Sequence, residues 1–358
     1  MVDYIGTARL KELVSALGTA RFIAALADEI EVDFRRWSEF DKSARHASHS
    51  AVGVIELMPI SDARHYSFKY VNGHPRNTHD GLLTVTAFGV LADVTTGYPL
   101  LLSEMTFVTA LRTAAVSALA ASKMARPDSR TMALIGNGAQ SEFQAIAFHL
   151  MNGVRALRLY DTDKDATRKL VRNLAALRMV DLEVRCCNSA SEAVRGADIV
   201  TTVTADKRNA LILTAEMIEP GMHINAVGGD CPGKTELQVD ILRRADARIV
   251  VEFEPQARIE GEIQQLNASE SVSEFTDVLC ATKPGRVGDD EVTIFDSVGF
   301  ALNDFSALRY LYRLNREQQV GRAKIDLVPI LDNPKDLFGE LVGTATRQPL
   351  SVKQSALV

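Results

Sequence analysis

The stretch TMALIGNGAQS, residues 131–141, decides the fold. Its first five residues are an apolar run typical of a buried strand, and a helix-like segment over 140–151 follows the glycines. The pattern G-x-G-x-x-S is a variant of the dinucleotide-binding fingerprint. In that fingerprint Gly136 permits a tight turn, and Gly138 lets the backbone approach a pyrophosphate at the helix N-terminus. Ser141 replaces the usual third Gly or Ala, so a plain strand–turn–helix is the alternative.

Asp161 strengthens the dinucleotide interpretation. It follows the next strand-like run, residues 156–160, and lies 25 positions after Gly136. A carboxylate at this point accepts hydrogen bonds from the adenosine ribose hydroxyls. Its charge would repel a 2′-phosphate, so Asp161 favours NAD over NADP, although Lys164 and Arg168 are close in the sequence.

Strand-like and helix-like segments keep alternating after Arg130, which is typical of a parallel sheet with right-handed crossovers. Further strands are expected over residues 199–203, 222–227 and 247–252. We therefore expect an α/β protein with a Rossmann-type dinucleotide-binding domain at 129–311. Residues 1–128 and 312–358 would form a second, discontinuous domain, with an Ala-rich helix over 109–125 and an amphipathic helix after about residue 307.

The composition limits the class of protein. The chain has 358 residues, 46% of them hydrophobic, and a formal net charge of −6. This charge argues against bulk binding of nucleic acid or an anionic membrane. The N-terminus lacks the apolar core of a signal peptide, and Arg112 interrupts the most apolar later stretch. The four cysteines form no CxxC pair. We expect a soluble, cytoplasmic protein with reduced thiols and no metal site.

Several charged residues stand in unusual surroundings. Arg112 lies early in a helix of small and apolar residues, and Lys69 lies opposite the aromatic face of a strand made by Tyr66, Phe68 and Tyr70. The alternatives are a surface or salt-bridged arginine and an exposed strand lysine. Glu56 interrupts an apolar run and must find a partner or face water.

The segment from His223 to Glu236 is the second strong feature. An apolar strand ends in two glycines and Asp230, at the carboxyl edge where open α/β sheets bind ligands. An acid on such a turn could exchange protons with a substrate amine. A helix cap or an Asx-turn is the competing interpretation.

The sequence resembles the ornithine cyclodeaminase/mu-crystallin family from about residue 20 to residue 340. The strings that carry the resemblance are DKSAR (41–45), GVIELMP (53–59), KYVNGHP (69–75), ALRTAA (110–115), LIGNGAQSEFQA (134–145), NAVGGDCPGKTEL (225–237), EGEIQQL (260–266) and FDSVGFAL (295–302). The resemblance implies a homodimer with tightly held NAD. It also implies that the second domain is an α+β domain that binds substrate and dimerises.

The resemblance also implies roles for individual residues. Arg45, Lys69 and Arg112 would bind the substrate carboxylate near the nicotinamide, with Val298 beside the substrate. Asp230 would be the catalytic acid/base, Glu56 would face the distal amine, and Lys69 would take part in catalysis. The implied cofactor-binding residues are Thr84, Arg112, Gly136, Gly138, Ala139, Gln140, Asp161, Thr204, Ile224, Asn225, Ala226, Val227, Lys234 and Ser297.

The implied reaction converts L-ornithine to L-proline and ammonia, with NAD taking a hydride and returning it in the same cycle. Three alternatives remain within the family. They are a lysine cyclodeaminase, an NAD(P)H-dependent ketimine reductase, and a non-catalytic binding protein of the mu-crystallin type.

Overall fold

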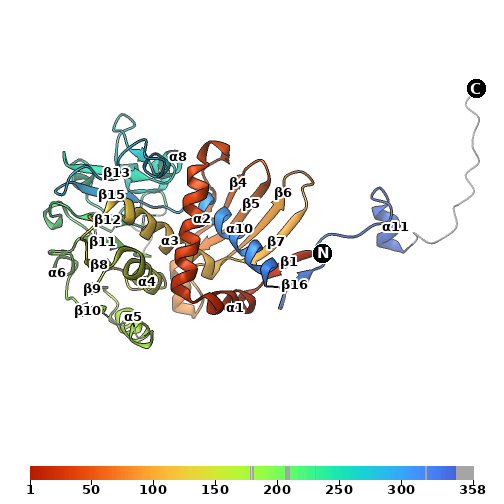
Figure 1. Cartoon of the computed structure of the whole chain (residues 1–358), viewed down its shortest axis with the longest axis horizontal. Helices are drawn as coiled ribbons and strands as arrows, with labels where there is room; N and C mark the ends of the chain where they lie inside the picture. The colour runs from red at the N-terminus through yellow and green to blue at the C-terminus, as the bar shows by residue number, and fades with distance from the viewer. Residues whose placement is uncertain (178, 180, 206–209, 230, 319–320, 344–358) are drawn as a thin grey trace, which may run out of the picture.

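The computed structural model describes residues 1–177, 179, 181–205, 210–229, 231–318 and 321–343. In this part of the chain the strands form two sheets of eight strands each. Helices α2 (Thr19–Arg35) and α3 (Thr106–Met124) lie between the two sheets (Figure 1). Within the described residues no helix is long and apolar enough to cross a membrane.

The first sheet is mostly antiparallel and has the order β16-β1-β7-β6-β5-β4-β2, with β3 also paired to β4. Its strands are β1 (Val2–Ile5), β2 (Asp41–Lys42), β3 (His46–His49), β4 (Val54–Ser61), β5 (His65–Gly73), β6 (Ala87–Asp93), β7 (Pro99–Glu104) and β16 (Ala323–Ile325). Because alternate residues of a strand point to opposite faces, Glu56 of β4 and Lys69 of β5 share the buried face. Helix α10 (Ala301–Glu317) packs on this face, and α2 packs on α10 (Figure 1).

The second sheet is parallel and has the order β10-β9-β8-β11-β12-β15-β13-β14. Its strands are β8 (Thr131–Ile135), β9 (Ala156–Tyr160), β10 (Glu183–Cys186), β11 (Ile199–Thr202), β12 (His223–Ala226), β13 (Ala247–Val251), β14 (Ser273–Glu274) and β15 (Val292–Asp296). The chain first adds β9 and β10 on one side of β8, and then β11 and β12 on the other. This reversal makes the carboxyl ends of β8 and β11 a topological switch point, where such sheets bind ligands.

The remaining helices connect these strands or lie at the chain ends. They are α1 (Thr7–Leu17), α4 (Ser141–Asn152), α5 (Lys164–Ala176), α6 (Ala190–Val194), α7 (Val239–Leu242), α8 (Glu254–Glu260), α9 (Phe275–Leu279) and α11 (Leu337–Val342). Helix α4 packs against α2 and α3 and so joins the two layers. Helix α11 lies apart from both sheets (Figure 1).

The structure confirms the strands predicted over 131–135 and 156–160, and places the others within a residue or two of their expected ends. Two helices begin earlier than expected. Helix α3 begins at Thr106 because Glu104 accepts hydrogen bonds from the first helical amides, including that of Phe107 at 3.1 Å. Helix α10 begins at Ala301, and residues 311 and 312 lie within it.

The structure also decides between the two interpretations of Lys69. Its side chain is 1% exposed, whereas Tyr66 on the opposite face is 41% exposed. The aromatic face of β5 therefore points outward, and the lysine points into the protein.

Candidate active site

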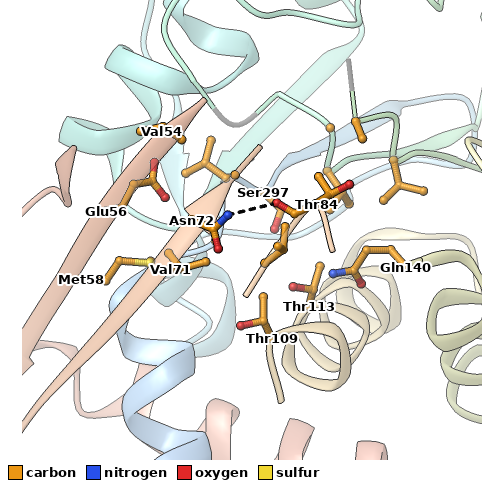
Figure 2. A pocket seen from close by; sticks show the side chains of 18 of the residues that line it. Val54, Glu56, Met58, Val71, Asn72, Thr84, Thr109, Thr113, Gln140 and Ser297 are labelled. Carbon is orange, nitrogen blue, oxygen red and sulfur yellow. Dashed lines mark hydrogen bonds between the residues drawn. The ribbon is translucent and has the colours of Figure 1, made fainter. Parts of the chain in front are cut away.

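A cavity lies between the two sheets, and both contribute to its wall. Strands β4 and β5 and helix α3 supply one side, and the carboxyl edge of the second sheet supplies the other. Figure 2 shows Glu56 and Asn72 on the strands facing Thr109 and Thr113 of α3, with Gln140 beside them. Asn72 donates a hydrogen bond from Nδ2 to the carbonyl oxygen of Thr84 at 3.4 Å.

The glycine turn after β8 has the geometry that the fingerprint requires. Gly136 has φ +96°, and a Cβ added there would lie 2.8 Å from the Val203 carbonyl oxygen, so only glycine fits. A Cβ added at Gly138 would meet no atom within 4 Å, which leaves that backbone open to a ligand. The hydroxyl of Ser141 donates to the Gly138 carbonyl at 2.7 Å. Serine at the third position is therefore accommodated by a local hydrogen bond.

Asp161 lies directly beside this turn. Its Oδ2 accepts a hydrogen bond from the Asn137 amide at 2.6 Å, and its Oδ1 accepts one from the Asp163 amide at 2.8 Å. These bonds fix the carboxylate at the end of β9, next to the N-terminus of α4. This is the place at which a dinucleotide's adenosine ribose meets an acid in such sheets.

Lys69 and Arg112 form the cationic end of the cavity. Lys69 Nζ lies 2.7 Å from Asp304 Oδ2, and Arg112 Nε lies 3.2 Å from Asp304 Oδ1. Burial lowers the pKa of Lys69 to about 8, although Asp304 acts in the opposite direction. Arg112 also lies against Gly299, where an added Cβ would come within 2.7 Å of Nη1.

Arg45 connects three segments around the cavity. Its Nη1 donates to Glu56 Oε2 at 3.0 Å, and its Nε lies 3.0 Å from Glu260 Oε2. Its Nη2 donates to the carbonyl oxygens of Val298 and Gly299 at 2.6 Å each. All three charged side chains are buried. Arg45 is thus the partner that the isolated carboxylate Glu56 required.

A second carboxylate holds the loop that carries Val298. Buried Glu252 accepts hydrogen bonds from the Gly299 amide at 2.7 Å and from the Ser297 hydroxyl at 3.3 Å. Lys234 is also buried and donates from Nζ to the Thr204 carbonyl at 2.8 Å. These contacts fix the backbone at the carboxyl edge of the second sheet.

Two further buried acids lie behind this edge. Burial raises the pKa of Glu262 to about 8 and that of Asp296 to about 7. Glu262 accepts from the amides of Glu236 and Leu237 at 2.8 and 3.0 Å, and Asp296 accepts from the amide of Ile263 at 3.0 Å. They anchor the segments that enclose the glycine-rich turn after β12.

The cavity brings together ten of the residues expected from the sequence, namely Arg45, Glu56, Lys69, Thr84, Arg112, Gln140, Thr204, Val227, Ser297 and Val298. The other expected site residues that the structure describes do not line this cavity, namely Gly136, Gly138, Ala139, Asp161, Ile224, Asn225, Ala226 and Lys234. Asp230 lies outside the described residues. Within those residues no group of three or more potential ligands is placed to hold a metal ion.

Sequence reasoning missed three carboxylates that hold the site together, Asp304, Glu260 and Glu252. Asp304 is the only acid in the first turn of α10, where it stands between Ala301–Leu302 and Phe305, so its sequence surroundings gave a weaker form of the signal that Glu56 gave. Glu260 lies within the string EGEIQQL, but nothing in its neighbourhood pointed to Arg45. The cationic partners of Asp304 and Glu260, and the loop that Glu252 holds, lie far away along the chain, and only the fold brings them together.

Comparison with known proteins agrees with this geometry. The sequence model of the ornithine cyclodeaminase/mu-crystallin family matches residues 9–319. Ornithine cyclodeaminase of Agrobacterium fabrum (strain C58) is 57% identical over 342 residues, which is 96% of this chain and 95% of the relative. A solved structure of lysine cyclodeaminase, described with recognition of L-lysine, L-ornithine and L-2,4-diaminobutyric acid, has a TM-score of 0.84 at 30% identity. It covers 93% of this chain and 98% of its own.

A third relative is an archaeal alanine dehydrogenase, solved as a dimer with bound NAD. Its TM-score is 0.80 at 30% identity, and the match covers 90% of this chain and 99% of that one. The likeness to both solved structures therefore extends over both sheets and the cavity between them.

Proposed function

The chain belongs to the ornithine cyclodeaminase/mu-crystallin family, and from this we propose that it is an NAD-dependent ornithine cyclodeaminase. The reaction converts L-ornithine to L-proline and ammonia, and would serve the catabolism of ornithine and arginine. The high identity to curated ornithine cyclodeaminases over nearly the whole chain supports this choice over the other activities of the family.

The charge distribution within one cavity is the observation that carries the proposal. Lys69 and Arg112 share one carboxylate, Asp304, so this group has a formal excess of one positive charge. Beside it, Arg45 pairs with two carboxylates, Glu56 and Glu260. A substrate that carries both a carboxylate and an ammonium matches this arrangement, because the cations attract the first and Glu56, which lines the cavity, attracts the second.

The wall of the cavity fits NAD. Gly138 leaves open space at the N-terminus of α4, and the side-chain oxygen of Gln140 is buried there with no hydrogen-bond partner among the described residues. We propose that the backbone amides of this turn hold the pyrophosphate, that the Gln140 oxygen accepts a hydrogen bond from the cofactor, and that Asp161 accepts from the adenosine ribose. The other proposed cofactor contacts are Thr84, Arg112, Gly136, Ala139, Thr204, Ile224, Asn225, Ala226, Val227, Lys234 and Ser297.

Bound NAD would supply the acceptor for a hydride from the substrate's α-carbon and the donor that returns it to the cyclic imine. The chain's own residues then have separate tasks. Lys69 and Arg112, with Arg45 beside them, hold the α-carboxylate, and Val298 packs beside the substrate. Glu56 faces the distal ammonium and takes its proton, because only the neutral amine can attack the α-carbon. We assign the remaining proton transfers, including the one to departing ammonia, to Asp230.

Product analysis tests this function. Purified protein incubated with L-ornithine and NAD should release proline and ammonia in equal amounts with no net NADH. Folded, NAD-loaded protein that makes no proline would refute the proposal. The same assay with L-lysine measures selectivity, and a difference of one methylene is expected to give about 1–3 kcal/mol of discrimination.

We also propose that the protein is a homodimer that associates through the outward face of the first sheet. This face exposes Ile55, Leu57, Tyr66 and Phe88, each more than 40% accessible, and Tyr70 stacks on Phe88 with ring centroids 5.0 Å apart. Apolar side chains gathered in this way on a sheet usually mark an association surface. The related alanine dehydrogenase was solved as a dimer.

Light scattering after gel filtration tests this interface. Phe88→Lys should produce monomers, whereas the control Leu150→Lys, at a slightly more exposed position on α4, should remain dimeric. A monomeric wild type, or equal behaviour of both variants, would exclude this interface.

We further propose a two-domain organisation, with α10 assigned to the domain of the first sheet because it packs on β4, β5 and β6. The boundary expected at residues 311 and 312 would then move to the loop before Ala301. A cytoplasmic location is proposed because all four cysteines are free thiols, which suits a reducing compartment.

A further inference from the structure

Lys69 and Arg112, two cations that line the cavity, both contact one carboxylate, Asp304. Asp304 contacts Lys69 through Oδ2 at 2.7 Å and Arg112 through Oδ1 at 3.2 Å. The three residues come from different elements, β5, α3 and α10. Lys69 and Arg112 line the cavity, whereas Asp304 does not. Asp304 therefore acts on a bound molecule through these two side chains rather than by direct contact.

The burial of this group makes the carboxylate necessary. The side chains of Lys69 and Asp304 are each 1% exposed, and that of Arg112 is 7% exposed. Two like charges taken out of water beside each other repel and lose hydration, and an ion pair with good geometry compensates for both effects. Asp304 also lies in the first turn of α10, where the helix dipole favours a negative charge.

The two cations lie against separate oxygens of this carboxylate. The short aspartate side chain therefore sets the spacing between the Lys69 ammonium and the Arg112 guanidinium. We propose that Asp304 is a positioning residue that aligns Lys69 and Arg112 for the substrate carboxylate. This inference rests on the proposed function, since it takes an amino acid as the ligand.

The charge on Lys69 depends on pH, and its neighbours set the pH at which that charge is lost. The charged groups that act on Lys69 are Asp304 on α10, Arg112 on α3 and Arg45 before β3, with Glu56 of β4 lining the same cavity. Of these Asp304 raises the pKa of Lys69, whereas both arginines and burial lower it. Without Asp304, Lys69 would lose its proton at lower pH and stop attracting a carboxylate.

The chain offers a matched control in Asp33 of α2. This carboxylate is also fully buried and also holds α10, because it accepts from Ser306 at 2.8 Å and pairs with Arg309 at 3.0 Å. Neither partner lines the cavity, and nor does Arg36, its third partner at 3.0 Å. Asp33→Asn therefore perturbs the anchoring of α10 without touching the cationic end.

The test compares Asp304→Asn with Asp33→Asn in steady-state proline formation across pH, with NAD binding measured in parallel. Asp304→Asn should raise KM for ornithine at least ~10-fold and move the alkaline limb of kcat/KM down by about 1–3 pH units. NAD binding should stay close to wild type. Asp33→Asn should lose thermal stability but keep the wild-type KM and pH profile.

Asp304→Glu covers the case in which Asp304→Asn does not fold. It keeps the charge but moves it by one methylene, so KM should rise while the alkaline limb stays in place. An unchanged KM in either Asp304 variant, or an equal change in Asp33→Asn, would overturn the assignment. Wild-type protein that binds NAD but forms no proline would instead refute the proposed function.

Discussion

Gly299→Ala tests whether catalysis depends on the place that Arg112 occupies. Gly299 has φ +77°, a left-handed conformation that costs other residues about 1–2 kcal/mol. The new Cβ would lie 2.7 Å from Arg112 Nη1, and ordinary van der Waals contact begins near 3.4 Å, so the guanidinium must retreat by about 0.7 Å. Because a displacement of about 1 Å can cost ~100-fold in rate, we expect kcat/KM to fall ~10- to 100-fold.

Gly97→Ala separates this effect from backbone strain. Gly97 has φ +72° in the turn between β6 and β7, and a Cβ there would meet no atom within 4 Å. Both variants should lose about 1–2 kcal/mol of unfolding free energy in urea. Only Gly299→Ala should lose activity in the proline assay. Wild-type kcat/KM in Gly299→Ala, with the loss of stability present, would refute the reasoning.

Three further predictions concern the cofactor, the stability and its pH dependence. Asp161→Ser should lower the affinity for NAD about 10-fold and raise the affinity for NADP relative to NAD in binding titrations. An unchanged ratio of the two affinities would contradict the proposed contact of Asp161 with the adenosine ribose. Arg45→Met should cost about 3–5 kcal/mol in urea unfolding, because it removes the arginine that pairs with the buried carboxylate Glu56; a loss below about 1 kcal/mol would contradict this. Burial lowers the pKa of His223 to about 3. Below pH 6.5 the native state therefore binds fewer protons than the unfolded chain, and the free energy of unfolding decreases as the pH is lowered. This contribution is about 2 kcal/mol at pH 5, and His223→Asn should show a correspondingly shallower decline between pH 6.5 and 5 in unfolding titrations.

Local patterns predicted five of the eight strands of the second sheet and missed β10, β14 and β15. The apolar run over 131–135 and the glycines after it predicted a strand and turn that the structure shows at the same residues. The start of α3 was not predicted, because Glu104 caps the helix from the preceding strand and no periodic pattern signals that contact. Sequence periodicity thus predicts which face of an element is buried better than where the element begins.

The charged pairs of the site could also be predicted only in part from the sequence. An isolated charge in apolar surroundings, such as Glu56 or Lys69, signalled that a partner had to exist. The identity of the partner could not follow from local sequence, because Lys69 meets Asp304 only when α10 packs on β5. Residue types at a site are therefore more predictable than the pairs they form.

The pairing of β1 with β16 has a consequence for synthesis on the ribosome. Strand β1 emerges first, but its antiparallel neighbour, at residues 323–325, and the helix that covers the first sheet emerge only after all of the second sheet. The second sheet is contiguous in the chain and can fold as soon as it leaves the exit tunnel. The first sheet must wait with its apolar inner face uncovered until α10 is made. Chaperone dependence should therefore be concentrated in the N-terminal third of the nascent chain, and truncation before residue 301 should release a polypeptide prone to aggregation.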